Sequence, residues 1–497
     1  MTTSPPEDTD HNTRMSSKPE VRIVVIGATT IALYILNYYV QRSIFYSGTY
    51  PTGAIPAAGA ANLIWQGSAY AGFVIALFVA YGAVLSTCMR GELAHGRATV
   101  YALAVPILVN VLLAVGRPWL SQDIFSYMAH GFLAVAPGHN PFLQPAEVAG
   151  EGAIGPALSA YGWHGVIGIT PYGILWTWIE KVVMELSGSN LLLALFLLKS
   201  VVVAASLGTA ICIWSFLGRT RPSSQLLGTL AYLWNPLVLA EFAGEGHNDA
   251  LLVFFVIATL AACAAARPTT SMVAQLLGIL SKYISLMFCP AQLVYLWRTG
   301  RGTTRLALQI IAAMAGVGVI AAVLYAPLWA GLHTFDGLLK RGQPISSASP
   351  FGAIYWILRR TPLSPLAAPL TLACVTLPLL ALIGWASLRV KDAASLAQAF
   401  AWISLGYVLL ASPDYWPWYA CMPVALIIVA DPDRLLWLAV LMSFMARLCA
   451  PLDLIRDHGF IGIVAAKGAL TGLGTTLPLV ALLLWLSRRR GSVMLNR

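Results

Sequence analysis

The sequence predicts an all-α protein that crosses a membrane many times. Hydrophobic residues make up 58% of the 497 residues and charged residues only 10%, whereas soluble domains carry about 25% charged residues. Residues 63–86 and 306–330 contain no charge, and each run exceeds the roughly 18 apolar residues expected of a membrane-spanning helix. The basic residues lie mostly in short segments between such runs, as in the cytoplasmic loops of membrane proteins.

These observations define the expected organisation. Residues 1–21 are polar and predict a disordered cytoplasmic tail. Residues 22–487 form a single transmembrane domain of about 12 to 14 helices, and residues 488–497 form a basic cytoplasmic tail. The expected location is the plasma membrane. The net charge of +10 follows from the basic loops, so no nucleic-acid partner is predicted.

One segment is too short for two full crossings. Arg267 and Arg298 both fall in predicted cytoplasmic loops, and two crossings need roughly 40 apolar residues between them. Residues 271–297 therefore predict a re-entrant pair of short helices, which is tolerated only beside protein or a polar cavity. Lys282 lies near the turn of this pair. An intramembrane lysine indicates a functional site, and the alternative is a lysine that reaches to the interface.

Two long segments are expected outside the cell. The first, residues 116–171, leads into an amphipathic helix at 172–186, and the second, residues 331–365, contains a short helix at 351–360. Amphipathic helices of this kind lie on a membrane surface. The polar chemistry of the protein is therefore predicted on the extracytoplasmic side.

Asp123 is the main catalytic candidate. It follows the apolar run 99–115, so it is expected where lipid meets water. A partly buried carboxylate is a stronger base and suits proton abstraction from an acceptor hydroxyl. The alternative is a structural ion pair with Arg117.

A second polar group occupies residues 244–249, at the end of a run broken by Asn235 and Pro236. Polar groups between membrane helices are costly unless they bind one another or a ligand. The alternative is a connecting turn that caps the next helix. His247 and Asp249 could contribute to a metal site, but no third ligand is identifiable. The predicted substrate-binding residues of this turn are Glu245, His247, Asn248 and Asp249.

Basic and aromatic groups complete the candidate site. A lipid phosphate requires cationic partners, for which Lys282 leads and Lys199, Lys340 and Arg341 are helpers. Lys199 could instead reach to the interface, and the two loop residues could be solvated. Residues 413–419 hold four aromatic residues and two prolines, which indicate an interfacial belt or a surface for stacking sugars.

Several of these segments resemble one enzyme family in order and spacing. They cover most of residues 100–420. The segments are Gln122-Asp123-Ile124-Phe125-Ser126-Tyr127, Gly138-His139-Asn140-Pro141-Phe142, Thr170-Pro171-Tyr172-Gly173, Trp234-Asn235-Pro236-Leu237, Gly246-His247-Asn248-Asp249, Lys282-Tyr283 and Trp416-Pro417-Trp418-Tyr419. Together they resemble the GT-C glycosyltransferases, and most closely the α-(1→6)-mannopyranosyltransferases of mycobacterial and corynebacterial lipoglycan assembly.

The resemblance implies a function. It predicts a GT-C-like bundle whose catalytic base is Asp123, with mannose moved from a polyprenyl phosphate to a lipoglycan or glycolipid acceptor and inversion to an α-mannoside. Many GT-C members carry two adjacent acidic residues where Asp123 stands alone, which argues against a paired-carboxylate metal site. No cofactor is expected, and nothing in the sequence supports a divalent cation. Further residues implied in substrate binding are Tyr127, His164, Tyr283, Trp416 and Trp418.

Other functions stay open at this point. The donor sugar could be arabinose or glucose. A lipid or sugar transporter would also span the membrane many times and hold intramembrane charges. Such transporters usually show paired broken helices in two related halves, whereas one broken segment and no internal repeat are seen here. A non-catalytic assembly partner in envelope synthesis is the last alternative.

Overall fold

A computed structural model describes residues 18–45, 57–93, 96–161, 163, 168–300, 303–339, 349–413 and 415–456. These residues form helices, with no β-strand among them. The predicted all-α fold is therefore confirmed. The described chain ends at Arg456, so the predicted tail at 488–497 lies outside it, as does most of the tail at 1–21.

The α-helices differ widely in length. The longer ones are α1 (Pro19–Phe45), α2 (Ala57–Met89), α3 (Arg97–Val115), α8 (Leu191–Thr220), α14 (Thr304–Tyr325), α17 (Ala367–Leu388) and α20 (Pro432–Arg456). The shorter ones are α4 (Asp123–Val135), α5 (Glu147–Gly150), α6 (Gly155–Ala160), α7 (Ile174–Ser187), α9 (Gln225–Leu233), α10 (Pro236–Val238), α11 (Asp249–Ala264), α12 (Pro268–Ser281), α13 (Cys289–Thr299), α15 (Asp336–Leu339), α16 (Pro350–Leu358), α18 (Ala393–Gly406) and α19 (Cys421–Ala430).

Tighter and wider helical turns join them. The π-helices are η2 (Leu239–Gly244) and η7 (Tyr407–Ala411). The 3-10 helices are η1 (Pro222–Ser224), η3 (Tyr283–Phe288), η4 (Ala326–Leu328), η5 (His333–Phe335), η6 (Ser364–Leu366) and η8 (Pro417–Ala420).

Seven helices of the described chain are long and apolar enough to cross a membrane, or eight if the bent pair 222–233 and 236–244 counts as one span. The protein is thus a multi-pass membrane protein. The expected number of about 12 to 14 is larger. Other apolar helices fall short of a full crossing, among them α11 and the segment Pro417–Ala430.

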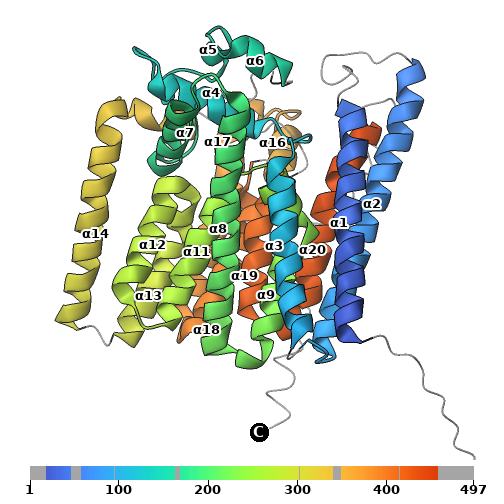
Figure 1. The fold of residues 1–497 in the computed structure, drawn as a ribbon. Helices are drawn as coiled ribbons and strands as arrows, with labels where there is room; N and C mark the ends of the chain where they lie inside the picture. Colours follow the sequence, from blue (N-terminus) through green and yellow to red (C-terminus); the bar gives the residue numbers. More distant parts are fainter. Residues whose placement is uncertain are drawn as a thin grey trace, which may run out of the picture.

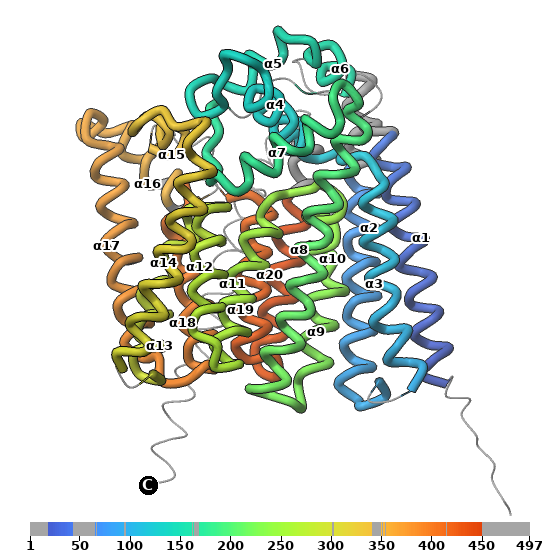
Figure 2. The backbone as a smooth tube through the Cα atoms, turned by 60° about the vertical axis from the view of Figure 1, so that its left-hand side comes forward, coloured from blue at the N-terminus to red at the C-terminus, as the bar shows by residue number. Residues whose placement is uncertain are grey.

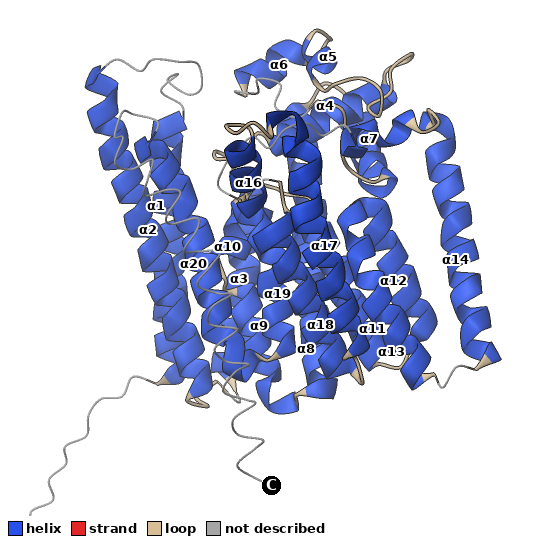
Figure 3. Cartoon of the chain, turned by 180° about the vertical axis from the view of Figure 1, so that it is seen from behind, coloured by secondary structure: helices blue, strands red, loops and turns tan. Residues whose placement is uncertain are grey.

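The long helices run side by side, and α4 to α7 lie across one end of the bundle (Figure 1). α1 and α2 form one edge and α14 the opposite edge, as the view from behind also shows (Figure 3). α19 lies in the interior, where every one of its residues is buried. We call the end that carries α4 and α7 the α4 end of the bundle.

The start of α1, the connection from α2 to α3 and the end of α13 lie at the end of the bundle opposite α4 (Figure 2). Arg22 pairs with Glu92 there, and Arg298 donates to the carbonyl of Val390. Arg22 directly follows the predicted cytoplasmic tail at 1–21, and Arg298 falls in a predicted cytoplasmic loop. These contacts link segments far apart in the sequence at one end of the molecule.

The segment around Lys282 reverses direction. Gln292 of α13 donates to Ser271 Oγ of α12 at 3.3 Å, and Gln275 of α12 donates to the carbonyl of Ser285 at 2.6 Å. α12 and α13 are therefore antiparallel neighbours, as the predicted pair of short helices requires. Lys282 lies at the turn, immediately after α12.

A second break follows Trp234. The side chain of Asn235 accepts a hydrogen bond from the amide of Leu237 at 3.0 Å and donates to Ser443 Oγ at 2.8 Å. This cap and the missing N–H of Pro236 end the regular helix. The two parts are bent by 40°, and the π-helix η2 follows. The bend leaves Glu241 of η2 inside the bundle with 2% of its surface exposed.

Candidate active site

The turn between η2 and α11 positions the polar residues of the α4 end. Gly246 has a φ of 81°, and a Cβ atom there would lie 2.5 Å from Ile124 Cδ1. A side chain at this position would therefore strain the backbone and collide with α4. The turn brings Glu245 and His247 into contact with different segments. Both side chains are buried.

Asp123 begins α4 and faces the turn. Its amide donates to Ser121 Oγ at 3.2 Å, and its carboxylate oxygen Oδ2 lies 3.5 Å from His247 Nδ1. Its side chain is 16% exposed, whereas that of His247 is 0% exposed. Asp123 is thus partly exposed, whereas the histidine that it contacts is fully buried. The alternative ion pair with Arg117 is not seen: the Arg117 guanidinium lies over the rings of Trp119 and Tyr161.

His247 lies between two carboxylates. Its Nε2 is 3.4 Å from Glu241 Oε2, while Glu241 Oε1 accepts a hydrogen bond from Arg447 at 2.8 Å. Arg447 also donates to the hydroxyl of Tyr70. The two His247 contacts are longer than usual hydrogen bonds, so their attraction is mainly Coulombic. We call Asp123, His247, Glu241 and Arg447 the buried charge network.

Electrostatics decide the charge of His247. Burial alone would lower the pKa of His247, but Asp123 and Glu241 outweigh that effect and raise it to about 9. The imidazole is therefore protonated at neutral pH. A cation beside Asp123 fixes the position of that carboxylate.

Lys282 forms a second charged group near the first. Its Nζ donates to both carboxylate oxygens of Asp249, at 2.9 and 2.8 Å. The ammonium lies 5.7 Å from the ring centroid of Tyr172 and 5.4 Å from that of Tyr419. Its side chain is 20% exposed. Gly173 allows the end of α12, which precedes Lys282, to pack closely against the start of α7. A Cβ atom at this position would lie 2.1 Å from the Leu280 carbonyl oxygen.

Aromatic rings connect the two charged groups. Trp418 stacks on His247 with ring centroids 3.8 Å apart, and Trp416 stacks on Trp418 at 5.3 Å. Tyr127 lies one turn after Asp123 on α4 and contacts the ring of Tyr172 at 5.4 Å. The predicted residues Asp123, Tyr127, His247, Asp249, Lys282, Trp416 and Trp418 are therefore gathered at one place.

Other predicted residues have structural partners. Glu245 accepts hydrogen bonds from the amides of Leu120 and Ser121, both at 3.0 Å. Lys199 is fully buried and donates to the carbonyls of Leu113 and Gly116, both at 2.6 Å. It therefore caps the C-terminal end of α3, which differs from the predicted phosphate contact.

Of the remaining predicted residues, two are described by the structure and three are not. The hydroxyl of Tyr283 bonds that of Tyr325 at 2.8 Å. Asn248 is buried, and its Oδ1 has no hydrogen-bond partner among the described residues. The predicted residues that lie outside the described chain are His164, Lys340 and Arg341. In the part of the chain described, no cluster of three or more His, Cys, Asp and Glu side chains could hold a metal ion.

Glu241, Arg447 and Tyr70 belong to the site but were missed in the sequence. Glu241 is a single acid in the apolar run 230–243, and Arg447 is a single cation among the apolar residues 435–449. Lone charges in membrane helices signal function or pairing, so both could have been selected. Nothing in the sequence distinguishes Tyr70 from other tyrosines.

Comparison with known proteins supports the resemblance. Residues 24–298 match the N-terminal domain of the alpha-(1->6)-mannopyranosyltransferase family. This is more than half of the chain, and it includes Asp123, Glu241, His247 and Lys282. The chain belongs to this family.

Two relatives carry the same family name. Alpha-(1->6)-mannopyranosyltransferase A of Mycobacterium tuberculosis is 28% identical over 359 residues, which are 66% of this chain and 64% of the relative. The protein of the same name from Corynebacterium glutamicum is 25% identical over 174 residues, 34% of this chain and 32% of the relative. The matched region thus spans less than two thirds of the length of these relatives.

The charge of His247 predicts a pH-dependent stability. Its pKa of about 9 in the folded protein exceeds the ordinary value of 6.5. The stabilisation by protonated His247 is therefore complete below pH 6.5 and is lost as the pH rises through about 9. This difference in pKa corresponds to about 3 kcal/mol in the free energy of unfolding. We expect His247→Gln to lower the melting temperature in detergent near pH 6 and much less near pH 10.

A matched control is His333→Gln. His333 contacts Asp336 at 3.0 Å but its side chain is 69% exposed, so its removal is expected to have little effect at either pH. Equal destabilisation by His247→Gln at both pH values would contradict a protonated His247.

A second buried carboxyl, Glu180 of α7, offers a contrast with Glu241. It is fully buried, and neither of its carboxyl oxygens has a hydrogen-bond partner among the described residues. Burial raises the pKa of Glu180 well above its usual range, although nearby Trp176 acts in the opposite direction. Glu180 is therefore a neutral acid, while Glu241 is held between two cations.

This contrast predicts different effects of the same substitution. Glu180→Gln replaces one neutral group with another of the same shape and is expected to change the melting temperature little. Glu241→Gln leaves Arg447 buried without its counter-ion, which typically costs about 3 to 5 kcal/mol. Thermal unfolding of both variants in detergent measures the difference. Equal melting temperatures of the two variants would show that the contact between Glu241 and Arg447 does not stabilise the protein.

Proposed function

We propose that this protein is a membrane glycosyltransferase that moves a mannosyl group from a polyprenyl-phosphate donor to a glycolipid or lipoglycan acceptor. The family match and the names of its relatives support mannose as the sugar. The multi-pass fold supports a substrate that is itself held in a membrane. The resemblance noted in the sequence supports the polyprenyl phosphate.

One observation carries the catalytic assignment. Asp123 is a partly exposed carboxylate whose neighbours are buried. His247 contacts its carboxylate, and Glu241 contacts His247 on the other ring nitrogen. A base must reach its substrate and keep a fixed orientation. Asp123 meets both conditions, and it lies among aromatic residues suited to sugar rings.

The proposed step is a single displacement. An acceptor hydroxyl gives its proton to Asp123 as its oxygen attacks C1 of the mannosyl group. The bond between C1 and the phosphate oxygen breaks, and its electron pair leaves with the polyprenyl phosphate. Attack opposite a β-linked phosphate gives an α-mannoside, so the configuration inverts.

Lys282 is the proposed phosphate partner. An ammonium has three N–H donors, and two contacts of Lys282 go to Asp249. The third donor is available to a phosphate oxygen, and Asp249 holds the side chain in place. Lys199 is left out of this proposal because its ammonium caps α3. Glu245 and Asn248 would contribute by fixing the turn that carries His247.

The proposed site faces away from the cytoplasm. Loops rich in Lys and Arg usually stay in the cytoplasm, and such loops lie at the end of the bundle opposite Asp123 (Figure 1). The donor and acceptor would meet at the outer surface of the plasma membrane.

Asp123→Asn is the decisive test of the function. We expect kcat for transfer from polyprenyl-phosphate mannose to fall by roughly 100- to 10,000-fold, as for loss of a general base, with little change in KM. Purified protein and a panel of polyprenyl-phosphate sugars measure this. Glu185→Gln, an exposed carboxyl on α7, serves as the control with wild-type activity. Equal turnover by Asp123→Asn and wild type would remove Asp123 as the base, and no transfer from any donor would contradict the function.

Lys282 has a separate expected outcome. Loss of a charge-assisted hydrogen bond costs about 1.5 to 3 kcal/mol, so Lys282→Gln is expected to raise KM for the donor by roughly 10- to 100-fold. Lys282→Arg keeps the charge and should restore most of the affinity. A variant Lys282→Gln with unchanged KM for the donor and reduced kcat would show that Lys282 does not bind the ground-state phosphate.

A further inference from the structure

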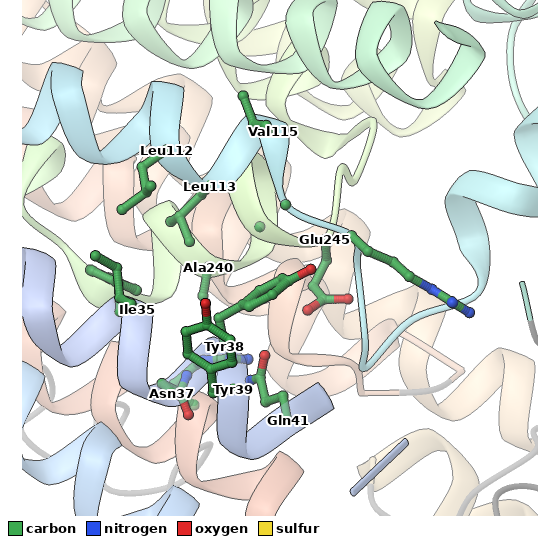
Figure 4. A pocket seen from close by; sticks show the side chains of 15 residues that line it. Ile35, Asn37, Tyr38, Tyr39, Gln41, Leu112, Leu113, Val115, Ala240 and Glu245 are labelled. Atoms are coloured by element: carbon green, nitrogen blue, oxygen red, sulfur yellow. The ribbon is translucent and has the colours of Figure 1, made fainter. Parts of the chain in front are cut away.

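Glu245 also lines a pocket between α1, α3 and η2. Its volume is about 410 Å³, within the roughly 300 to 1,000 Å³ typical of small-molecule sites. Figure 4 shows Asn37, Gln41 and Glu245 around one part of it and Ile35 and Leu112 around another. Asp123 and Lys282 do not line it. The pocket is therefore distinct from the proposed catalytic residues.

The polar part of the pocket offers hydrogen bonds to hydroxyl groups. Tyr34 and Asn37 are 4% and 6% exposed, and neither Tyr34 Oη nor Asn37 Oδ1 has a partner among the described residues. Buried polar atoms normally form hydrogen bonds, so these two atoms offer hydrogen-bonding positions to a ligand in the pocket. Gln41 and Glu245 line the same pocket. Amide, phenol and carboxyl groups together suit the adjacent hydroxyls of a sugar or polyol.

The cations of the pocket are already engaged. Arg447 bonds Glu241 and Tyr70. Arg117 donates to the carbonyl of Tyr161 and lies over the rings of Trp119 and Tyr161. Both arginines line the pocket, but their charges are committed to other groups. A phosphate needs unengaged cationic donors. The pocket therefore favours a neutral, hydroxyl-bearing group over an anionic one.

The apolar part opens along two membrane helices. Ile35, Tyr39 and Val115 line the pocket and are 40%, 59% and 71% exposed. α1 and α3 are both long and apolar enough to cross a membrane, so their exposed sides would meet lipid. A ligand with a polar head and an apolar tail fits this combination, with its tail lying along the two helices.

We propose that this pocket binds the hydroxyl-bearing headgroup of a neutral glycolipid, with its lipid tail against α1 and α3. The site rests on the pocket alone and does not depend on transferase activity. Glu245 connects it to the catalytic residues, because the same carboxyl holds the amides of Leu120 and Ser121. A bound headgroup would therefore lie beside the loop that precedes Asp123.

Lipid retention by the full-length protein tests the proposal. The protein is reconstituted in phosphatidylcholine nanodiscs with monoglucosyl diacylglycerol or phosphatidylglycerol of the same acyl chains, and bound lipid is counted by native mass spectrometry. We expect the glycolipid to be retained at least about 10-fold better than phosphatidylglycerol, as loss of one or two hydrogen bonds implies. Asn37→Leu should abolish this preference.

Two further variants control for folding. Tyr34→Phe removes only the hydroxyl and should weaken glycolipid retention about 5- to 10-fold. Thr30→Val removes a buried hydroxyl of the same helix that bonds Ile26, outside the pocket, and should retain lipid like the wild type. Equal retention of both lipids by the wild type, or wild-type retention by Asn37→Leu and Tyr34→Phe, would overturn the proposal. Asp123→Asn should bind the glycolipid normally, which separates this result from a failure of the proposed transfer reaction.

Discussion

Glu241 is a carboxylate inside a membrane protein, and it lies between the cations of Arg447 and His247. A buried charge without a partner costs several kcal/mol, so each member of the network depends on the others. Glu241 belongs to η2, Arg447 to α20 and His247 to the turn before α11. The ion pairs therefore specify how these three segments meet, and with them the place of Asp123.

Two other polar groups hold the loop that leads to Asp123. Lys199 bonds the carbonyls that end α3, and Glu245 bonds the amides of Leu120 and Ser121. The chain from α3 to α4 is thus held at both ends by buried side chains of α8 and the turn after η2. Catalytic groups work only when their supporting structure fixes them to within a fraction of an ångström. These residues provide that support without touching a substrate.

The irregular helices have a shared consequence. π-helical turns are frequent at functional sites because they interrupt the regular spacing of side chains. η2 contains Glu241, and η7 precedes the segment that carries Trp416 and Trp418. η2 thus contributes directly to the charge network, and η7 leads into the aromatic segment that stacks on His247. They allow apolar membrane helices to present polar and aromatic side chains at one end of the bundle.

The sequence by itself determined the helical membrane fold and the pair of short helices on either side of Lys282. These features depend on local composition, on helix length and on residues close together in the chain. Only the tertiary structure paired Glu241 with Arg447, 206 residues apart. It also brought His247 beside Asp123 and Lys199 beside the carbonyls of Leu113 and Gly116. Such contacts depend on how helices pack, and packing joins segments whose sequences carry no sign of each other.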